Sequence, residues 1–264
     1  MKNLPTELFW ELASELRCSI LFELQNQNLK PTSLVKKLGQ TIQEIHRQCD
    51  RLEKIHFIKR QAKGELSLTS LGKMTLDQFS YFGFLLKNKK YFDEHDTGSL
   101  PMQFVQRLGV LENCELLEGT FAIMERWKKI SKEAKEHLRF VSVQVSLDVF
   151  RLGVASAKKG TVVSLVHGKN TIYPKGSKKE ITSNTVQDLI EKQVYQRKMV
   201  DTIDVVVVFN EKQGTIVFPD LHGKTDVSYT FAGNDAPFLD WCNDYFDWMW
   251  KKAGRWDISK MREV

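Results

Sequence analysis

The sequence predicts a small α+β domain at the N-terminus, followed by a larger α/β domain that contains a mixed sheet. Apolar residues recur every three or four positions through residues 8–55, as on one face of a helix, whereas short apolar runs typical of strands follow residue 139. The charge is divided in a similar way. Residues 1–91 contain 15 Lys and Arg against 9 Asp and Glu, and residues 92–264 contain 24 of each, so the net charge of +6 belongs to the N-terminal part. This distribution is typical of an anion-binding module joined to a separate body.

The composition excludes several classes of protein. With 264 residues, of which 42% are hydrophobic and 27% charged, the chain can bury a sizeable core and is not of the disordered type. It has no apolar stretch of the roughly 18 residues that a transmembrane helix needs. Its first residues do not resemble a signal peptide, so we expect a cytoplasmic protein with no membrane partner. The cysteines are too far apart for a zinc ribbon or a disulfide scaffold, and we expect no metal and no cofactor. They are Cys18, Cys49, Cys114 and Cys242.

The first third of the chain predicts three helices and a hairpin. A regular apolar stripe predicts one long helix over residues 5–26, and a short helix follows the start signal at Pro31. Gly39 then supplies a turn that favours positive φ. Thr41 is placed to cap a third helix over residues 41–54, and two short strands around Gly64 read as a β-hairpin. The residues expected on the buried face of the third helix are Ile42, Ile45, Cys49 and Leu52.

This order of elements is that of a winged helix-turn-helix. The segment PTSLVKKLGQTIQEIHRQCDRLEKIHFIKRQAKGELSLTSLGKM resembles archaeal and bacterial winged-helix regulators of the ArsR type, and Leu68-Thr69-Ser70-Leu71-Gly72 matches their closing motif. His56 departs from the family pattern, which has glycine before the first strand of the wing. The resemblance implies a DNA-binding domain.

The predicted second helix of the motif carries side chains suited to the major groove. In a helix-turn-helix this helix reads base edges, and Gln and Arg pair bidentately with adenine and guanine. Basic residues of the wing are placed to contact phosphates, which fix register without reading sequence. An ordinary solvated helix face is the alternative interpretation. The candidate contacts to double-stranded DNA are Gln40, Thr41, Gln43, Glu44, Arg47, Gln48, Arg51, Lys59, Arg60 and Lys63.

The remainder of the chain predicts a helical region and then an α/β domain. We expect a winged-helix domain over residues 1–75, a helical linker and dimerisation region over 76–138, and a sensor or assembly domain over 139–264. Long helices are expected at 69–91 and 114–137, and their apolar faces predict a homodimer. Strands are expected at 140–145, 161–166, 204–209, 215–218 and 227–231, and helices at 147–158, 185–193 and from Asp235 onward. Strands that alternate with helices favour a mixed sheet.

The body also carries a family resemblance. The segments LGVLENCELLEGTFAIMERW and FVSVQVSLDVF, together with the closing pattern around DAPFLDWCNDYFDWMWKKA, resemble archaeal regulators of the Fil type. The closing pattern is also similar to TrmB-type regulators, whose sensor domain is similar to the phospholipase D superfamily. These resemblances imply a transcription factor whose second domain senses a ligand.

The sequence does not predict an enzyme. Phospholipase D chemistry needs H-x-K-x-x-x-x-D, but the aspartate position is Pro174 after His167-Gly168-Lys169 and Tyr229 after His222-Gly223-Lys224. A ligand of an α/β domain commonly lies beyond strand ends, which makes Ser146, Asp148 and His167 candidates for an effector site. Asp148 is alternatively only a helix cap, and the body alternatively only assembles the dimer.

We therefore expect a dimeric, sequence-specific transcriptional regulator controlled by a small-molecule effector. One alternative is a winged-helix protein that mediates protein interaction or assembly without specific DNA binding. A second alternative is a phosphodiester enzyme, which the incomplete motif disfavours.

Overall fold

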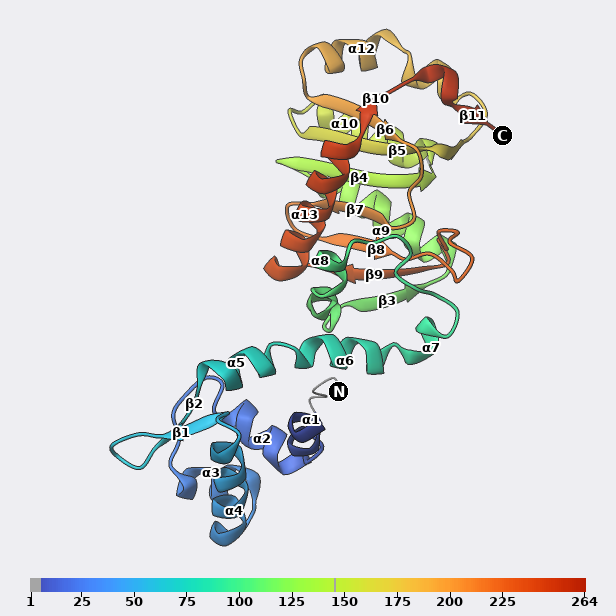
Figure 1. The fold of residues 1–264 in the computed structure, drawn as a ribbon. Helices are drawn as coiled ribbons and strands as arrows, with labels where there is room; N and C mark the ends of the chain where they lie inside the picture. The colour runs from blue at the N-terminus through green and yellow to red at the C-terminus, as the bar shows by residue number, and fades with distance from the viewer. Residues whose placement is uncertain (1–5, 145) are drawn as a thin grey trace. The chain divides into compact units, whose positions relative to one another are not determined.

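The computed structural model describes residues 6–144 and 146–264, and these form two compact units that meet in sequence between Phe82 and Gly83 (Figure 1). The helical region expected over residues 76–138 is divided between them, with residues 76–82 in the first unit and residues 83–138 in the second. Helix α6, Phe79–Lys87, contains the boundary.

The first unit has the order of elements predicted for a winged helix. Its elements are α1 Thr6–Leu12, α2 Glu15–Glu23, α3 Pro31–Leu38, α4 Ile42–Lys54, β1 Ile58–Arg60, β2 Leu66–Leu68 and α5 Ser70–Leu76. The prediction of one long helix over residues 5–26 was wrong, because the chain leaves the helix at Ala13 and Ser14 starts a new one. The Ser14 side chain accepts a hydrogen bond from the Arg17 amide, which caps α2.

The core of the first unit is formed by the inner faces of its helices and the wing. Ile20, Leu34, Ile45 and Leu52 are fully buried in one cluster, together with Leu66 from the wing. The predicted burial of Ile45, Cys49 and Leu52 is confirmed, whereas Ile42 is 39% exposed at the first turn of α4. The stripe on α4 is therefore narrower than the sequence indicated, and Ile42 belongs to the outer surface.

The second unit is an α/β domain. After α6 come α7 Lys89–Phe92, α8 Met102–Val105, a 3₁₀ turn at Leu108–Leu111, β3 Glu115–Glu118, α9 Thr120–Glu133, β4 His137–Gln144, α10 Leu147–Ala157, β5 Val162–Tyr173, α11 Ser177–Ile181, α12 Asn184–Glu191 and β6 Tyr195–Val200. The rest comprises β7 Val206–Asn210, β8 Gly214–Val217, β9 Tyr229–Gly233, α13 Ala236–Lys252, β10 Gly254–Arg255, a second 3₁₀ turn at Ile258–Lys260 and β11 Arg262–Glu263.

The sheet is mixed, as predicted. In the described part of the chain nine strands pair in the order β10-β6-β5-β4-β7-β8-β9-β3, with β11 alongside β5. Strands β4, β5 and β6 run parallel, and β7, β8 and β9 form an antiparallel meander. The expected long helix at 114–137 was wrong, since Glu115–Glu118 pairs with β9 and Gly119, with φ 96°, separates this strand from α9.

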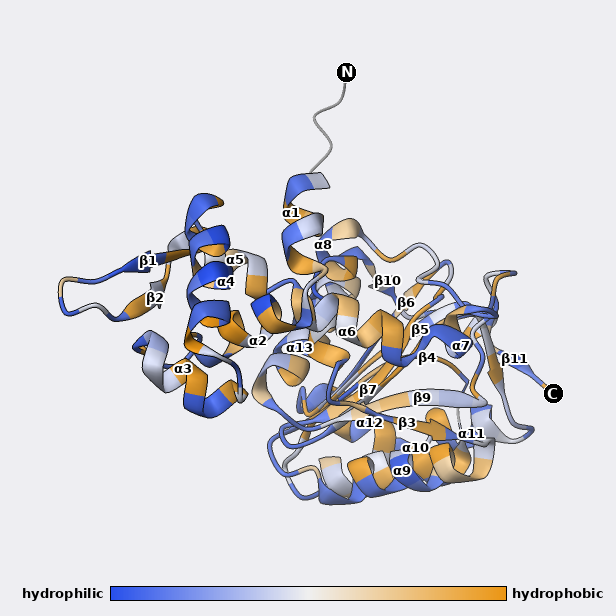
Figure 2. Cartoon of the chain, turned by 90° about the horizontal axis from the view of Figure 1, so that it is seen from below, coloured by the Kyte–Doolittle hydropathy of each residue, from blue (hydrophilic) through white to orange (hydrophobic). Residues whose placement is uncertain are grey.

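Helices cover both faces of this sheet. Figure 1 and Figure 2 place α9 and α10 on one face and α13 on the other, and the ribbons of α9 and α10 contain both hydrophobic and hydrophilic segments. Val206, Val207, Val208 and Phe209 of β7 are fully buried, as expected for a strand between two helical layers. None of the helices in residues 6–144 and 146–264 combines the length and the apolar character needed to cross a bilayer.

Candidate nucleic-acid interface

The turn between α3 and α4 is built as the sequence predicts. Gly39 adopts φ 65°, and its amide donates to the Val35 carbonyl, which ends α3 in a left-handed cap. The Thr41 hydroxyl then accepts from the Glu44 amide at 3.3 Å and caps α4. These two local devices fix the angle at which α4 leaves the turn.

The outer face of α4 is polar and solvent-accessible, and most of its ribbon is hydrophilic in Figure 2. The Arg47 side chain is 70% exposed, and Gln40, Thr41 and Gln43 are exposed before it. Arg47 donates to the Glu44 carboxylate at 2.8 Å, and this hydrogen bond, with a second from Gln48, lowers the pKa of Glu44. This pair is exposed and weak, and it uses only part of the five N–H donors of Arg47, so the guanidinium can still contact a base edge.

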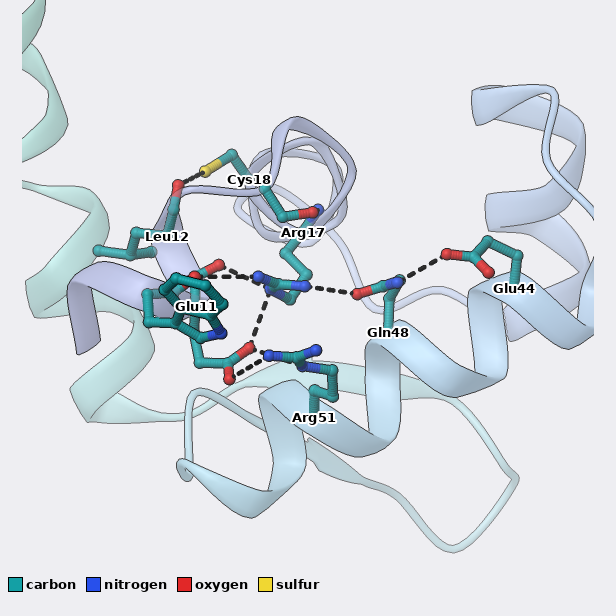
Figure 3. A network of polar contacts seen from close by, with 9 residues as sticks. Glu11, Leu12, Arg17, Cys18, Glu44, Gln48 and Arg51 are labelled. Atoms are coloured by element: carbon teal, nitrogen blue, oxygen red, sulfur yellow. Dashed lines mark hydrogen bonds and ion pairs between the residues drawn. The ribbon is translucent and has the colours of Figure 1, made fainter. Parts of the chain in front are cut away.

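Two predicted contacts lie on the inner side of α4 and belong to a polar network, which Figure 3 shows. Gln48 is 6% exposed, so its predicted place on the outer face was wrong. Its amide oxygen accepts from Arg17 at 2.8 Å, and its amide nitrogen donates to Glu44 at 2.6 Å. Arg51 is half-buried and donates both of its bonds, at 2.7 and 2.9 Å, to the carboxylate of Glu11.

The network joins α1 and α2 to α4. Glu11 is 8% exposed and Arg17 is 6% exposed, and their side chains meet at 3.0 Å. Arg17 also donates to the backbone carbonyls of Glu11 and Trp10. The hydrogen bond from Arg51 lowers the pKa of Glu11 against the opposing effect of burial. Buried charges are tolerated only when paired and hydrogen-bonded, which this arrangement achieves.

The wing presents two lysines and one paired arginine. Lys59 and Lys63 are exposed and form no ion pair with the described residues. Arg60 donates to Asp50 at 2.8 Å and to Glu53 at 3.0 Å, so its charge is balanced within the unit. Gly64 at the tip has φ 75°, which suits a tight hairpin turn. Lys59 and Lys63 remain the cations of the wing that are open to a phosphate.

Sequence reasoning missed two residues on this surface. His46 is exposed between Gln43 and Arg47, and Ile42 is exposed at the first turn of α4. His46 lies three residues after Gln43, a spacing that places both side chains on one face of a helix, and this was the signal available in the sequence. Ile42 was assigned inward because an apolar residue beside a stripe is normally buried.

The predicted effector residues are only partly brought together. Ser146 and His167 line one cavity of the second unit, whereas Asp148 points to solvent and pairs with Lys128 at 3.4 Å. Asp148 lies in the first turn of α10 without a capping hydrogen bond, so neither of its predicted roles matches the geometry.

The two H-x-K segments lie in different environments. His167 is buried on β5, and Lys169 pairs with Asp201 at 2.5 Å. His222 and Lys224 lie in the exposed turn after β8, where their amides donate to Asp220. Within residues 6–144 and 146–264, no group of three His, Cys, Asp or Glu side chains has the geometry of a metal site.

The fold resembles known structures only distantly. No protein-family model and no curated protein matches the sequence. TrmBL2, described as an archaeal chromatin protein with a novel mode of DNA binding, is 12% identical at a TM-score of 0.42, with 91% of this chain and 94% of that chain covered.

Two further similar structures match only about half of this chain. The phospholipase D family member Nuc from Salmonella typhimurium is 11% identical, with a TM-score of 0.39, and covers 55% of this chain and 97% of its own. NucT from Helicobacter pylori is 8% identical, with a TM-score of 0.41, and covers 55% of this chain and 99% of its own. Both likenesses concern the fold alone.

Proposed function

We propose that this chain is a sequence-specific DNA-binding transcriptional regulator that reads the major groove with α4. The observation that carries the proposal is the outer face of α4, where Gln43 and Arg47 stand exposed on a helix that a tight turn and an N-terminal cap hold in a winged-helix scaffold. Such a helix enters the major groove, and amide and guanidinium side chains read base edges there.

The charge distribution supports the same proposal. The exposed Lys59 and Lys63 of the wing supply cations beside α4, and phosphate contacts of this kind give affinity that falls with salt. The balanced pairs of Arg60 with Asp50 and Glu53 limit this non-specific term. The contact set that we now propose for DNA is Gln40, Thr41, Gln43, His46, Arg47, Lys59 and Lys63.

We further propose that the chain acts as a homodimer, because helix-turn-helix proteins gain affinity from two half-sites. Most of the apolar face of α9 is not available for this, since Ile123, Trp127 and Ile130 are buried within its own unit, although Phe121 in its first turn is 80% exposed. Large apolar side chains are exposed in both units, and we assign the interface to those of the first unit, which also carries the proposed DNA surface. The exposed large apolar side chains of the first unit are Phe9, Trp10, Phe22, Ile42, Leu71, Met74 and Phe82.

The same exposed apolar side chains favour the second candidate function, a winged helix that binds a protein partner. The two candidates make opposite predictions for DNA. Selection of bound fragments from genomic DNA, followed by titration of the enriched fragment at increasing salt, tests the proposal directly. Enrichment of one sequence with a tight, salt-dependent complex supports the regulator, and no enrichment over random fragments rejects it.

We infer that the body is not a phosphodiesterase. The position required for the aspartate of the first motif is Pro174, and Lys169 is engaged by Asp201. Double-stranded DNA that stays intact after long incubation supports this inference, and specific cleavage that is lost on His167→Ala contradicts it.

A further inference from the structure

The cavity that contains Ser146 and His167 has an unusual combination of walls. Its interior volume is about 40 Å³, which on this measure is room for roughly three water molecules, and the pocket is partly open to solvent, so that a ligand longer than the interior can extend out of it. Strands β4, β5 and β6 and helix α10 supply most of its lining, and much of that lining is apolar, including Phe140, Phe150 and Leu165. A small site of this kind suits a ligand with a short hydrocarbon part and one polar end.

Arg197 is the cation in this lining. No carboxylate among the described residues forms an ion pair with it, whereas Arg107, Arg139 and Arg151 of the same unit all have such partners. Its guanidinium lies 3.7 Å from the centre of the Trp256 ring and donates one hydrogen bond, at 3.2 Å, to the Ile181 carbonyl. A guanidinium has five N–H donors, so most of the donors of Arg197 are available.

Partial burial of the Arg197 guanidinium is unfavourable unless a negative charge pairs with it. Desolvation lowers the pKa of Arg197, which reports that its charged form is poorly solvated. A partly buried cation without a counter-charge is unfavourable, and an incoming anion removes that penalty.

Several neutral hydrogen-bonding side chains lie in the same lining, and two of them, His167 and Ser146, are the candidates to contact a ligand. His167 is 6% exposed, and its Nδ1 lies 2.5 Å from the Tyr173 hydroxyl, while its Nε2 forms no hydrogen bond with the described residues. Burial, aided by the charge of Arg197, lowers the pKa of His167 to about 4, so the ring is neutral near pH 7. Ser146 immediately precedes α10, and its hydroxyl caps no amide of that helix.

We propose that this cavity binds the carboxylate of a small organic acid, with Arg197 as its counter-charge, Ser146 and His167 as hydrogen-bonding partners, and the apolar walls in contact with the hydrocarbon part. One cation matches a monoanion, and a phosphate dianion would leave charge uncompensated beside apolar side chains. If the proposed regulator function holds, this acid is the effector. The binding itself does not depend on DNA.

Calorimetric titration of the full chain tests the site with four probes: acetate, butyrate, the uncharged butyramide and inorganic phosphate. We expect saturable binding of one butyrate per chain, weaker binding of acetate and no binding of butyramide. Arg197→Gln should weaken butyrate at least tenfold, and Arg197→Lys should recover part of the affinity. Arg107→Gln, a surface arginine of the same unit, is the matched control and should bind as wild type does.

A spectroscopic measurement separates ligand contact from a structural role of Arg197. Butyrate should shift the imidazole resonances of His167 and raise its pKa, because an anion favours the protonated ring. If Arg197 only supports the fold, its replacement lowers the thermal stability of the chain. Butyrate then leaves the resonances and the pKa of His167 unchanged in the wild-type chain.

The proposal is overturned if no carboxylate binds saturably or if phosphate binds more tightly than butyrate. It is also overturned if Arg197→Gln binds butyrate as tightly as the control Arg107→Gln does. DNA binding measured without added acid keeps the two proposals separate. A chain that binds DNA but no carboxylate rejects the cavity proposal alone, and one that binds butyrate but no specific DNA rejects the regulator alone.

Discussion

Replacing Glu11 by alanine tests whether the polar network between α1, α2 and α4 holds the N-terminal unit together. Arg17 is 6% exposed, so the substitution leaves its guanidinium buried without a carboxylate. Removal of one partner from a buried ion pair costs about 3–5 kcal/mol. The Arg51 side chain is 42% exposed and can hydrate instead, so its loss adds little. We therefore expect the free energy of unfolding of this unit to fall by about 3 kcal/mol.

Hydrogen exchange of the full chain is the assay, because peptides from α2 and α4 report on the first unit separately from the second. Glu7→Ala, at an exposed position of the same helix, is the control and should change stability by less than about 1 kcal/mol. The double substitution Glu11→Leu with Arg17→Met should lie near wild type, since apolar replacement of a buried pair is often neutral. A loss below about 1 kcal/mol for Glu11→Ala would show that the pair behaves as an exposed one and would refute this reasoning.

Three further predictions concern a strained residue, a buried histidine and the dimer. His56 has φ 61°, a conformation that glycine adopts without strain, so His56→Gly should stabilise the first unit by up to about 1 kcal/mol in urea unfolding. His46→Gly, within α4, is the control and should destabilise the unit by about 1 kcal/mol. Equal effects of the two substitutions would show that His56 is not strained. The pKa of His167 is about 4 when folded, below the ordinary value of 6.5, so the unfolded chain takes up a proton first as pH falls. Wild type should lose roughly 3 kcal/mol between pH 6.5 and 4 that His167→Phe does not lose, and parallel pH profiles would refute this. Trp10 is 71% exposed, and Trp10→Ser should weaken dimerisation at least about tenfold in sedimentation analysis. Lys36→Ser is the control and should leave dimerisation unchanged. A wild-type chain that is monomeric both with and without DNA rejects the dimer.

Local signals in the sequence predicted the helix-turn-helix well. The Gly39 turn and the Thr41 cap act over three or four residues, and both have the predicted roles. The Asp235 side chain likewise accepts a hydrogen bond from the Phe238 amide, three residues further on, and caps α13. Such devices depend on neighbouring residues, so one sequence is sufficient to recognise them.

Contacts between residues far apart in the chain could not be predicted from the sequence. Gln48 and Arg51 have the polar character of an outer face, and only the buried Glu11 and Arg17, more than thirty residues away, turn them inward. Strand β3 was assigned to a helix because Leu116 and Leu117 fit a helical stripe, and its pairing with β9 lies far along the chain.

The candidate cavity illustrates the same limit. His167 and Ser146 were found from strand ends, but Arg197 lies on β6, a strand whose sequence, YQRKMV, is too polar to stand out. The pocket exists because parallel pairing places β6 beside β5, and no local pattern near Arg197 indicates that neighbour.

Equilibrium binding of the selected DNA fragment by wild type, Arg47→Ala and Lys63→Ala at several salt concentrations tests the central claim most directly. Arg47→Ala should cost roughly 1–3 kcal/mol on this fragment and relax base preference at one or two positions. Lys63→Ala should weaken all sequences about equally and reduce the salt slope by about one unit. Lys179→Ala in the second unit is the control. If Arg47→Ala binds the fragment with wild-type affinity and preference, α4 does not read DNA and the account is contradicted.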